Sequence, residues 1–341
     1  MTAFLALREL PLDRTIPVPP YSAAPAESVA GLIEGERLTV RDLLVAMLLP
    51  SANDAAATVA SGVSGSQEAF VTEMNAAAAD LGLDRTSFAN PIGLDDPLNF
   101  STAADLADLT LELREDRTFR EIVAMPEATL RSGAVERVVV TRNTLLLADP
   151  SVDGVKTGHT TEAGYVLVAS AKREGVPLVS VVLGAASEAA RDAETAELLE
   201  YGYSLYEERS AFREEEELAS APVSYEETPL GLLARRELPV VAREDQELEA
   251  EVDAPPFVEG PIDRGERIGR ATVTLDGEVV GTVPLVAARG IAEPTWVDRI
   301  GGPLVVAGIV ALAVVILLAV ALVLRHRARD SGRRSAARRR A

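Results

Sequence analysis

One feature constrains the folding of this 341-residue chain more than any other: an uncharged, apolar run over residues 300–324. At about 1.5 Å per residue, a helix of that length can cross the roughly 30 Å hydrocarbon core of a bilayer. The alternative is a buried core helix, but such helices rarely run so far without a polar face. The run therefore predicts a single membrane-spanning helix, flanked on its N-terminal side by Trp296.

The charges on the two sides of this run are sharply unequal. The tail 325–341 holds eight arginines and one acid, and its +7 within a net charge of −20 leaves −27 for residues 1–299. Positive flanks remain in the cytoplasm, which predicts a single-pass protein of the cell membrane with an extracytoplasmic body and a cytoplasmic C-terminus. The tail could instead bind nucleic acid, but it directly follows the span. A body this acidic is not expected to bind nucleic acid.

An extracytoplasmic body requires an export signal, and residues 1–10 do not resemble one. They have no basic start, Arg8 interrupts the apolar run, and no small-residue cleavage site follows. We therefore expect the natural protein to begin upstream of Met1.

The composition excludes several kinds of site. The chain has no cysteine, so a disulfide framework, a thiolate metal site and a cysteine nucleophile are impossible. Its two histidines, His159 and His326, are too few for an ordinary zinc site. We expect neither a metal nor a cofactor.

Periodicity divides the body into two parts. Helical patterns and a proline-rich loop over residues 11–37 occupy the first 125 residues. A hairpin near Ser132-Gly133, three sheet strands between residues 151 and 183, the first ending at Lys156, and a helix over 187–206 follow. Short strands separated by Pro and Gly then continue to residue 290, with a hairpin at Asp276-Gly277. The predicted parts are an α+β domain (1–210), a small all-β domain (218–290), a linker (291–299), the transmembrane helix (300–324) and the basic tail (325–341).

Lysine is rare in this chain. Only two lysines occur against 31 arginines, and one is Lys156 in Val155-Lys156-Thr157-Gly158-His159. An ammonium is compact and its pKa falls on burial, whereas a guanidinium has neither property. A lysine kept at this position indicates chemistry at a carboxylate or a nucleophilic hydroxyl. A Lys-Thr-Gly tripeptide is short enough to arise by chance, so it needs further context.

Two further motifs supply that context. Ser51-Ala52-Asn53 follows Pro50 between two predicted helices, where alone it would be an ordinary helix cap, and Asn90–Pro97 forms a polar turn. Penicillin-binding proteins and β-lactamases carry the set Ser-x-x-Lys, Ser-Asp-Asn and Lys-Thr-Gly. Together these motifs closely resemble the serine-type D-alanyl-D-alanine carboxypeptidase family of low-molecular-mass penicillin-binding proteins. The resemblance covers residues 1–206, and more weakly 218–290 as the family's β-rich second domain.

The resemblance implies an α+β penicillin-binding/β-lactamase-like transpeptidase fold, and one departure from the pattern stands out. The family's Ser-x-x-Lys motif precedes a helix that often reads Met-Thr-Ala, and here Met1-Thr2-Ala3 opens the chain. We expect the nucleophilic serine, its base lysine and two strands of the sheet to lie upstream of Met1.

The resemblance also implies a role for each motif residue. Peptidoglycan stem peptides would be the substrates and β-lactams the inhibitors. The residues are Ser51 as a proton relay, Asn53 for orienting the substrate amide and the base lysine, Lys156 and Thr157 for the substrate carboxylate, Gly158 for close approach of the substrate backbone, the backbone N–H of His159 for the oxyanion, and Arg191 as a second contact to the carboxylate.

Two other functions stay open. A catalytically inactive module could use Lys156 to bind wall peptides, and the 341-residue chain itself would behave that way. A β-lactamase of the same fold is the other possibility. The second β-rich domain and the membrane helix argue against a β-lactamase, as does the lack of a Glu-x-x-Leu-Asn segment between the second and third motifs.

Overall fold

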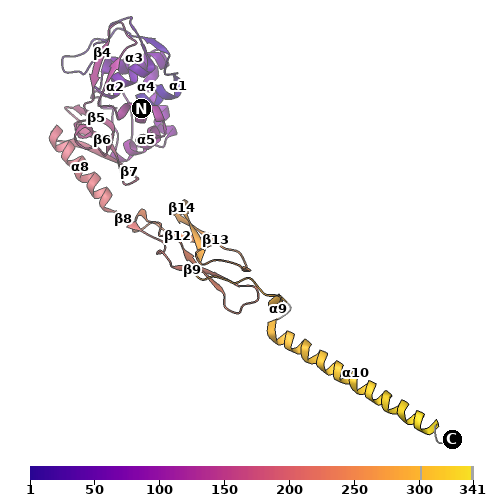
Figure 1. Cartoon of the computed structure of the whole chain (residues 1–341). Coiled ribbons are helices and arrows are strands. Elements are labelled where there is room, and N and C mark those ends of the chain that lie inside the picture. The colour runs from indigo at the N-terminus through magenta and orange to yellow at the C-terminus, as the bar shows by residue number, and fades with distance from the viewer. Residues whose placement is uncertain (300–301, 339–341) are drawn as a thin grey trace. The chain divides into compact units, whose positions relative to one another are not determined.

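The computed structural model describes the backbone of residues 1–299 and 302–338, and the side chains of residues 1–299 and 304–325. Ile300 and Gly301 of the predicted span, and the tail side chains after Arg325, lie outside these ranges. The chain divides into two compact units, Met1–Tyr206 and Glu207–Ala341 (Figure 1).

Six helices form the first part of the N-terminal unit. Thr39 and Ser66 cap two of them by accepting hydrogen bonds from backbone N–H groups three residues on, as expected of hydroxyl side chains at a helix start. Their buried faces are mostly Ala, Val and Leu, which form one hydrophobic core. The helices are α1 (Thr2–Glu9), α2 (Val40–Leu48), α3 (Asn53–Ser64), α4 (Gln67–Asp80), α5 (Ala103–Glu115) and α6 (Arg117–Val123).

The prediction of a loop over residues 11–37 is wrong near both ends of that range, where short strands form. Strands β1 (Thr15–Pro17) and β2 (Arg37–Thr39) pair there in antiparallel fashion. Ile16 lies opposite Leu38, and both side chains are buried, so the pairing contributes to the core. The segment between the two strands contains no helix or strand.

A three-stranded antiparallel sheet carries the second half of this unit. Its strands are β5 (Val152–Thr160), β6 (Gly164–Arg173) and β7 (Val176–Ala185), with β6 in the middle. Helix α8 (Glu188–Ser204) packs against β6 and β7. The hairpin of β3 (Glu127–Leu130) and β4 (Arg137–Val140) and the short helix α7 (Thr144–Ala148) precede the sheet.

The first sheet strand does not end at Lys156, which corrects the predicted boundary. Strand β5 continues to Thr160, and Gly158 and His159 still pair with Val166 and Tyr165 of β6. Thr157 is buried, so the alternation of inward and outward side chains carries through the Lys-Thr-Gly motif. This motif therefore lies within a strand, at one edge of the sheet.

The second unit is built around a five-stranded antiparallel sheet in the order β12-β13-β14-β10-β9. Asp276 and Gly277, with φ of 50° and 82°, form the predicted tight turn between β13 and β14. The core is aliphatic, with Leu230, Val273 and Leu285 fully buried. The strands are β8 (Tyr206–Arg209), β9 (Glu217–Ala221), β10 (Leu230–Ala234), β11 (Val240–Arg243), β12 (Leu248–Asp253), β13 (Arg267–Leu275) and β14 (Glu278–Ala287), and β8 pairs with β11.

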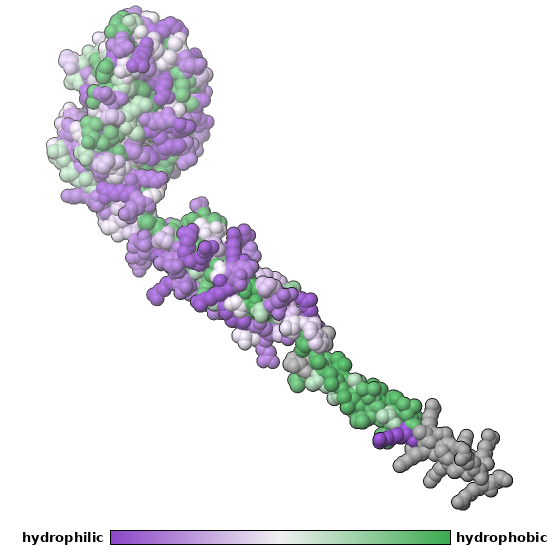
Figure 2. Space-filling model, viewed as in Figure 1, coloured by the Kyte–Doolittle hydropathy of each residue, from purple (hydrophilic) through white to green (hydrophobic). Residues whose placement is uncertain are grey.

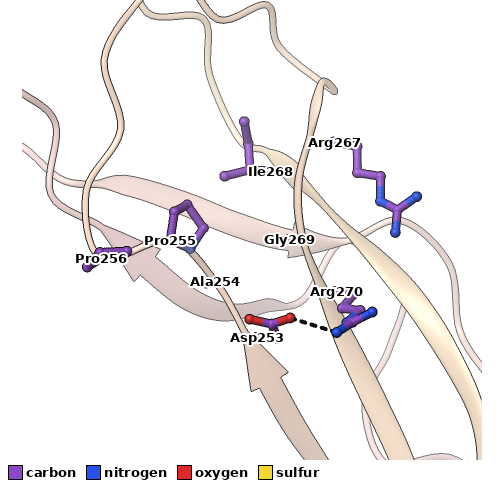
Figure 3. A pocket seen from close by; sticks show the side chains of 8 residues that line it. All are labelled: Asp253, Ala254, Pro255, Pro256, Arg267, Ile268, Gly269 and Arg270. Atoms are coloured by element: carbon purple, nitrogen blue, oxygen red, sulfur yellow. Dashed lines mark ion pairs between the residues drawn. The ribbon is translucent and has the colours of Figure 1, made fainter.

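A shallow hollow of about 600 Å³ opens on this unit between the end of β12 and the start of β13 (Figure 3). Its polar side chains are largely Arg267 and the pair Asp253 and Arg270, whose charged groups lie 3.0 Å apart. Pro255, Pro256 and Ile268 supply its apolar surface. Both members of the ion pair are exposed to solvent, which screens their interaction.

Helices α9 (Trp296–Arg299) and α10 (Gly302–Arg338) follow the β-rich unit. In the described part of the chain, one segment, Leu304–Arg325, is long and apolar enough to cross a membrane. Apart from the terminal Arg325 its side chains are apolar, and its visible face is mostly hydrophobic (Figure 2), as expected for a helix surrounded by lipid. Helix α10 is thus a candidate membrane anchor.

Candidate active site

Ser51 lies in the short connection between α2 and α3. Its φ of 64° is in the left-handed region, which residues other than glycine rarely adopt. The turn is held by a hydrogen bond from the N–H of Ala52 to the carbonyl of Ala46, 3.0 Å long. Strained backbone of this kind concentrates at functional sites, and here it precedes the first residue of α3, Asn53.

Lys156 connects the Lys-Thr-Gly motif to the Ser-Ala-Asn motif by a hydrogen bond. Its ammonium donates to the Ser51 hydroxyl at 2.8 Å and to the carbonyl of Thr157 at 2.6 Å. Burial, together with the positive charges of Arg142 and Arg191, lowers the pKa of Lys156 to about 8. The side chain can therefore exchange its proton near neutral pH while staying within hydrogen-bond distance of a hydroxyl.

Strand β5 is fixed in place just before Lys156. Arg114 of α5 reaches across to β5 and binds both carboxylate oxygens of Asp153, at 3.1 and 3.0 Å. The same guanidinium donates to Ser170 of β6 at 2.6 Å. A bidentate contact of this kind restrains both distance and orientation, so it holds the edge strand against the helical part of the unit.

The rest of the Lys-Thr-Gly-His motif shapes the strand surface. Thr157 is buried, and a β-carbon at Gly158 would lie 2.8 Å from a methyl group of Val166. The exposed His159 ring packs on Tyr165, with ring centroids 4.0 Å apart. Glycine at this position therefore lets Val166 of β6 pack closely against β5, and the His159 side chain packs against Tyr165.

Several of the motif residues line one cavity of about 350 Å³. Ser51, Asn53, Lys156 and Thr157 line it, whereas Gly158, His159 and Arg191 do not. Its other polar lining residues are Thr2, Asn90, Asn99 and Thr110. Apolar residues from several elements make up most of the remaining wall: Met1, Met47, Phe88, Ile92, Leu109, Phe119, Val166 and Val168. Such an apolar cavity with a few convergent polar groups is the usual form of a small-molecule site.

Arg191 is buried on α8, away from the lining of this cavity. Its guanidinium donates to Asp192 at 2.7 Å, to the Thr144 hydroxyl at 3.1 Å and to Glu188 at 3.2 Å. Its positive charge still reaches Lys156 as a contribution to the lowered pKa. The role of Arg191 at a substrate carboxylate stays a prediction.

Two neighbours of the motif residues were not anticipated. Arg142 lies near Lys156 because its backbone N–H binds the carbonyl of Leu49, 3.1 Å away, beside the Ser51 turn. Glu27, from the segment between β1 and β2, accepts a hydrogen bond of 3.0 Å from the Asn53 side chain. Neither residue belongs to a sequence motif, so only the tertiary structure reveals them.

Models of known protein families match both units of the chain. The family model described as D-alanyl-D-alanine carboxypeptidase, Peptidase S11, matches residues 1–187. The model of the penicillin-binding protein 5 C-terminal domain matches residues 206–293.

Two relatives illustrate the similarity in sequence. D-alanyl-D-alanine carboxypeptidase DacF of Bacillus subtilis is 31% identical over 282 residues, which are 81% of this chain and 72% of the relative. D-alanyl-D-alanine carboxypeptidase DacC of Escherichia coli is 32% identical over 278 residues, or 80% of this chain and 69% of the relative.

Solved structures agree with these relatives. Penicillin binding protein 5 from Haemophilus influenzae is 28% identical with a TM-score of 0.56, over 86% of this chain and 88% of that one. The Streptomyces K15 DD-transpeptidase is 32% identical with a TM-score of 0.56, over 60% of this chain and 85% of that one. The expected penicillin-binding/β-lactamase-like α+β fold, followed by a small β domain, is confirmed. The chain belongs to the D-alanyl-D-alanine carboxypeptidase family, a family of serine hydrolases.

Proposed function

We propose that this protein removes the terminal D-Ala of peptidoglycan stem peptides through a serine acyl-enzyme, at the cavity beside Lys156. The observation that carries the proposal is the 2.8 Å contact between the Lys156 ammonium and the Ser51 hydroxyl. It joins two motifs that lie 105 residues apart in the chain, within one mostly apolar cavity.

In the proposed reaction, a serine hydroxyl adds to the carbonyl of the penultimate D-Ala, and the peptide C–N bond then breaks. The leaving amine takes a proton and departs as D-Ala, and water hydrolyses the resulting ester to restore the serine. The resemblance assigns the nucleophilic serine and its base lysine to the family's Ser-x-x-Lys motif, which does not occur in these 341 residues.

The residues of this chain would bind the substrate and move one proton. Lys156 and Thr157 would hold the terminal carboxylate of the substrate, since a part-buried cation attracts it strongly. The Ser51 oxygen accepts from Lys156, which leaves its own O–H to protonate the leaving amine. The backbone N–H of His159 would be one oxyanion donor, and Gly158 would let the substrate backbone approach the edge strand.

Fluorescent penicillin tests the proposal on the full-length protein. We expect covalent labelling, release of free D-Ala from a pentapeptide, and slow turnover of penicillin. Labelling with rapid penicillin turnover and no D-Ala release would identify a β-lactamase. No labelling of the full-length protein would overturn the enzyme proposal and favour an inactive module that binds wall peptides.

We also propose that α10 crosses the cell membrane once, with residues 1–299 outside and the C-terminus in the cytoplasm. The cysteine-free chain offers a clean test, since Glu227→Cys and Ser335→Cys each introduce a single thiol. In intact cells, a membrane-impermeant maleimide should label the first variant and not the second. Labelling of Ser335→Cys in intact cells would contradict this orientation.

A further inference from the structure

The segment between β1 and β2 lies along the start of α3, next to the cavity. The backbone N–H of Asn53 donates to the carbonyl of Ser28 at 2.8 Å. The carboxylate of Asp54 accepts from the N–H groups of Ala30 and Leu32, at 3.0 and 2.9 Å. Asp54 is itself buried, so these contacts tie the segment firmly to the residues that follow Ser51.

Glu27 extends these contacts to the side chain of Asn53. One oxygen of Glu27, Oε2, accepts from Nδ2 of Asn53 at 3.0 Å and from the hydroxyl of Tyr21. The other oxygen, Oε1, accepts from the N–H of Ala24 at 2.9 Å. The hydrogen bonds from Asn53 and Tyr21 lower the pKa of Glu27, so the side chain is a carboxylate at neutral pH.

This carboxylate determines which way the Asn53 amide points. A carboxylate only accepts hydrogen bonds, whereas an amide has a donating nitrogen and an accepting oxygen at nearly equal positions. With the amide turned over, its oxygen would face the Glu27 oxygen and both lone pairs would repel. The nitrogen must therefore face Glu27, and Oδ1 is turned to the other side of the amide.

We propose that Glu27 is a positioning residue that fixes the amide orientation of Asn53 for the reaction. This inference rests on the proposed function. With one N–H held by Glu27, Asn53 keeps Oδ1 as an acceptor for the base lysine and one N–H as a donor for the substrate amide. A freely turning amide would offer the wrong atom for part of the time, which would slow acylation more than it would weaken substrate binding.

Glu27→Gln tests this role with little change in shape. The glutamine must place its NH₂ group against either the Ala24 N–H or the Asn53 and Tyr21 donors, so it loses at least one hydrogen bond. Glu34→Gln is the matched control, because Glu34 is an exposed carboxylate on the same segment. Tyr21→Phe removes one donor and keeps the carboxylate.

In the full-length protein, we expect Glu27→Gln to lower kcat for D-Ala release about tenfold, with KM nearly unchanged. The rate of labelling by fluorescent penicillin should fall by a similar factor. Tyr21→Phe should have a smaller effect, and Glu34→Gln should stay within about twofold of the unsubstituted protein. A Glu27→Gln variant with the same kcat as Glu34→Gln would overturn the inference while leaving the proposed function intact.

A second measurement does not depend on activity. The chain has only five asparagines, so selective ¹⁵N-asparagine labelling gives few side-chain amide signals, and Asn53→Ala identifies the one of interest. We expect the Asn53 amide protons to exchange slowly with water, and faster in Glu27→Gln than in Glu34→Gln. An unchanged signal in Glu27→Gln would overturn the inference even if the protein did not react with penicillin. Equal thermal midpoints of the two variants would show that folding is not the cause.

Discussion

The hollow on the β-rich unit and the cavity beside Lys156 differ in how far their charges are exposed to solvent, as well as in size. The larger one, on the β-rich unit, contains Arg267 and the ion pair of Asp253 and Arg270, all of them exposed. The smaller one holds Lys156, which forms no ion pair with a carboxylate among the described side chains and hydrogen-bonds a hydroxyl instead. A part-buried, uncompensated charge beside apolar walls attracts a charged ligand strongly, whereas solvent screens the attraction of exposed charges. Volume is therefore the poorer guide to function.

Removing the uncompensated charge should have the largest effect. Lys156→Met leaves the cavity without its cation, and we expect kcat/KM for D-Ala release by the full-length protein to fall about a thousandfold. The matched control is Lys172→Met, since Lys172 is the only other lysine and is exposed. Steady-state kinetics on a pentapeptide measure both. Comparable losses of kcat/KM in the two variants would show that the charge of Lys156 has no special role in the cavity.

Replacing Ser51, the hydroxyl partner of Lys156, should have the next largest effect on activity. We expect Ser51→Gly to lose about a hundredfold in kcat, because the proton relay is gone. The same change relieves the left-handed φ of 64° but also removes a hydrogen bond of the Lys156 ammonium, so the free energy of unfolding should change by less than about 1 kcal/mol. Kinetics and chemical denaturation test the two halves of this prediction. A variant that stays fully active, or whose free energy of unfolding changes by more than this, would contradict it.

The lowered pKa of Lys156 predicts a pH dependence at the cavity. Above about pH 8 the free enzyme loses the ammonium charge that attracts the substrate carboxylate, so KM should rise about tenfold per pH unit. A bound carboxylate favours the charged form, so kcat should change less over the same range. Lys156→Arg keeps its charge in alkaline solution and should not show the rise. A flat KM from pH 7 to pH 10 would show that the ammonium does not bind substrate.

The hollow of the β-rich unit should give the smallest response. Arg270→Ala breaks an exposed ion pair, so we expect D-Ala release to be unchanged and the free energy of unfolding to shift by less than about 0.5 kcal/mol. The same kinetic and denaturation assays apply. A clear loss of activity would show that this hollow also takes part in function.

Much of the fold was predictable because its signals are local. Thr39 caps a helix within the region predicted to be helical, Asp276-Gly277 forms the predicted turn, and three strands form the sheet predicted between residues 151 and 183. Strands β1 and β2 were missed because three residues such as Thr15–Pro17 are too short to show a period. Their pairing depends on burying Ile16 against the rest of the core, which is a tertiary effect.

The residues of the candidate site divide in the same way, into those that local motifs predict and those that only tertiary contacts reveal. Ser51, Asn53 and Lys156 were predicted as one site from their motifs, and the structure brings them to one cavity. Glu27 and Arg142 carry no motif and reach the site through contacts between distant segments. A glutamate in a proline-rich loop is ordinarily a solvated side chain, so its contact with Asn53 could not be inferred from spacing.

The scarcity of lysine has a consequence for covalent labelling. Amines react with electrophiles in their neutral form, and at pH 8 roughly half of a side chain with the pKa of Lys156 is neutral, against well under 1% for an ordinary lysine. The chain has one other ε-amino group, on Lys172. A carboxylate-bearing acylating reagent would therefore find one strongly preferred ε-amine in this protein, located in the cavity where the substrate is proposed to bind.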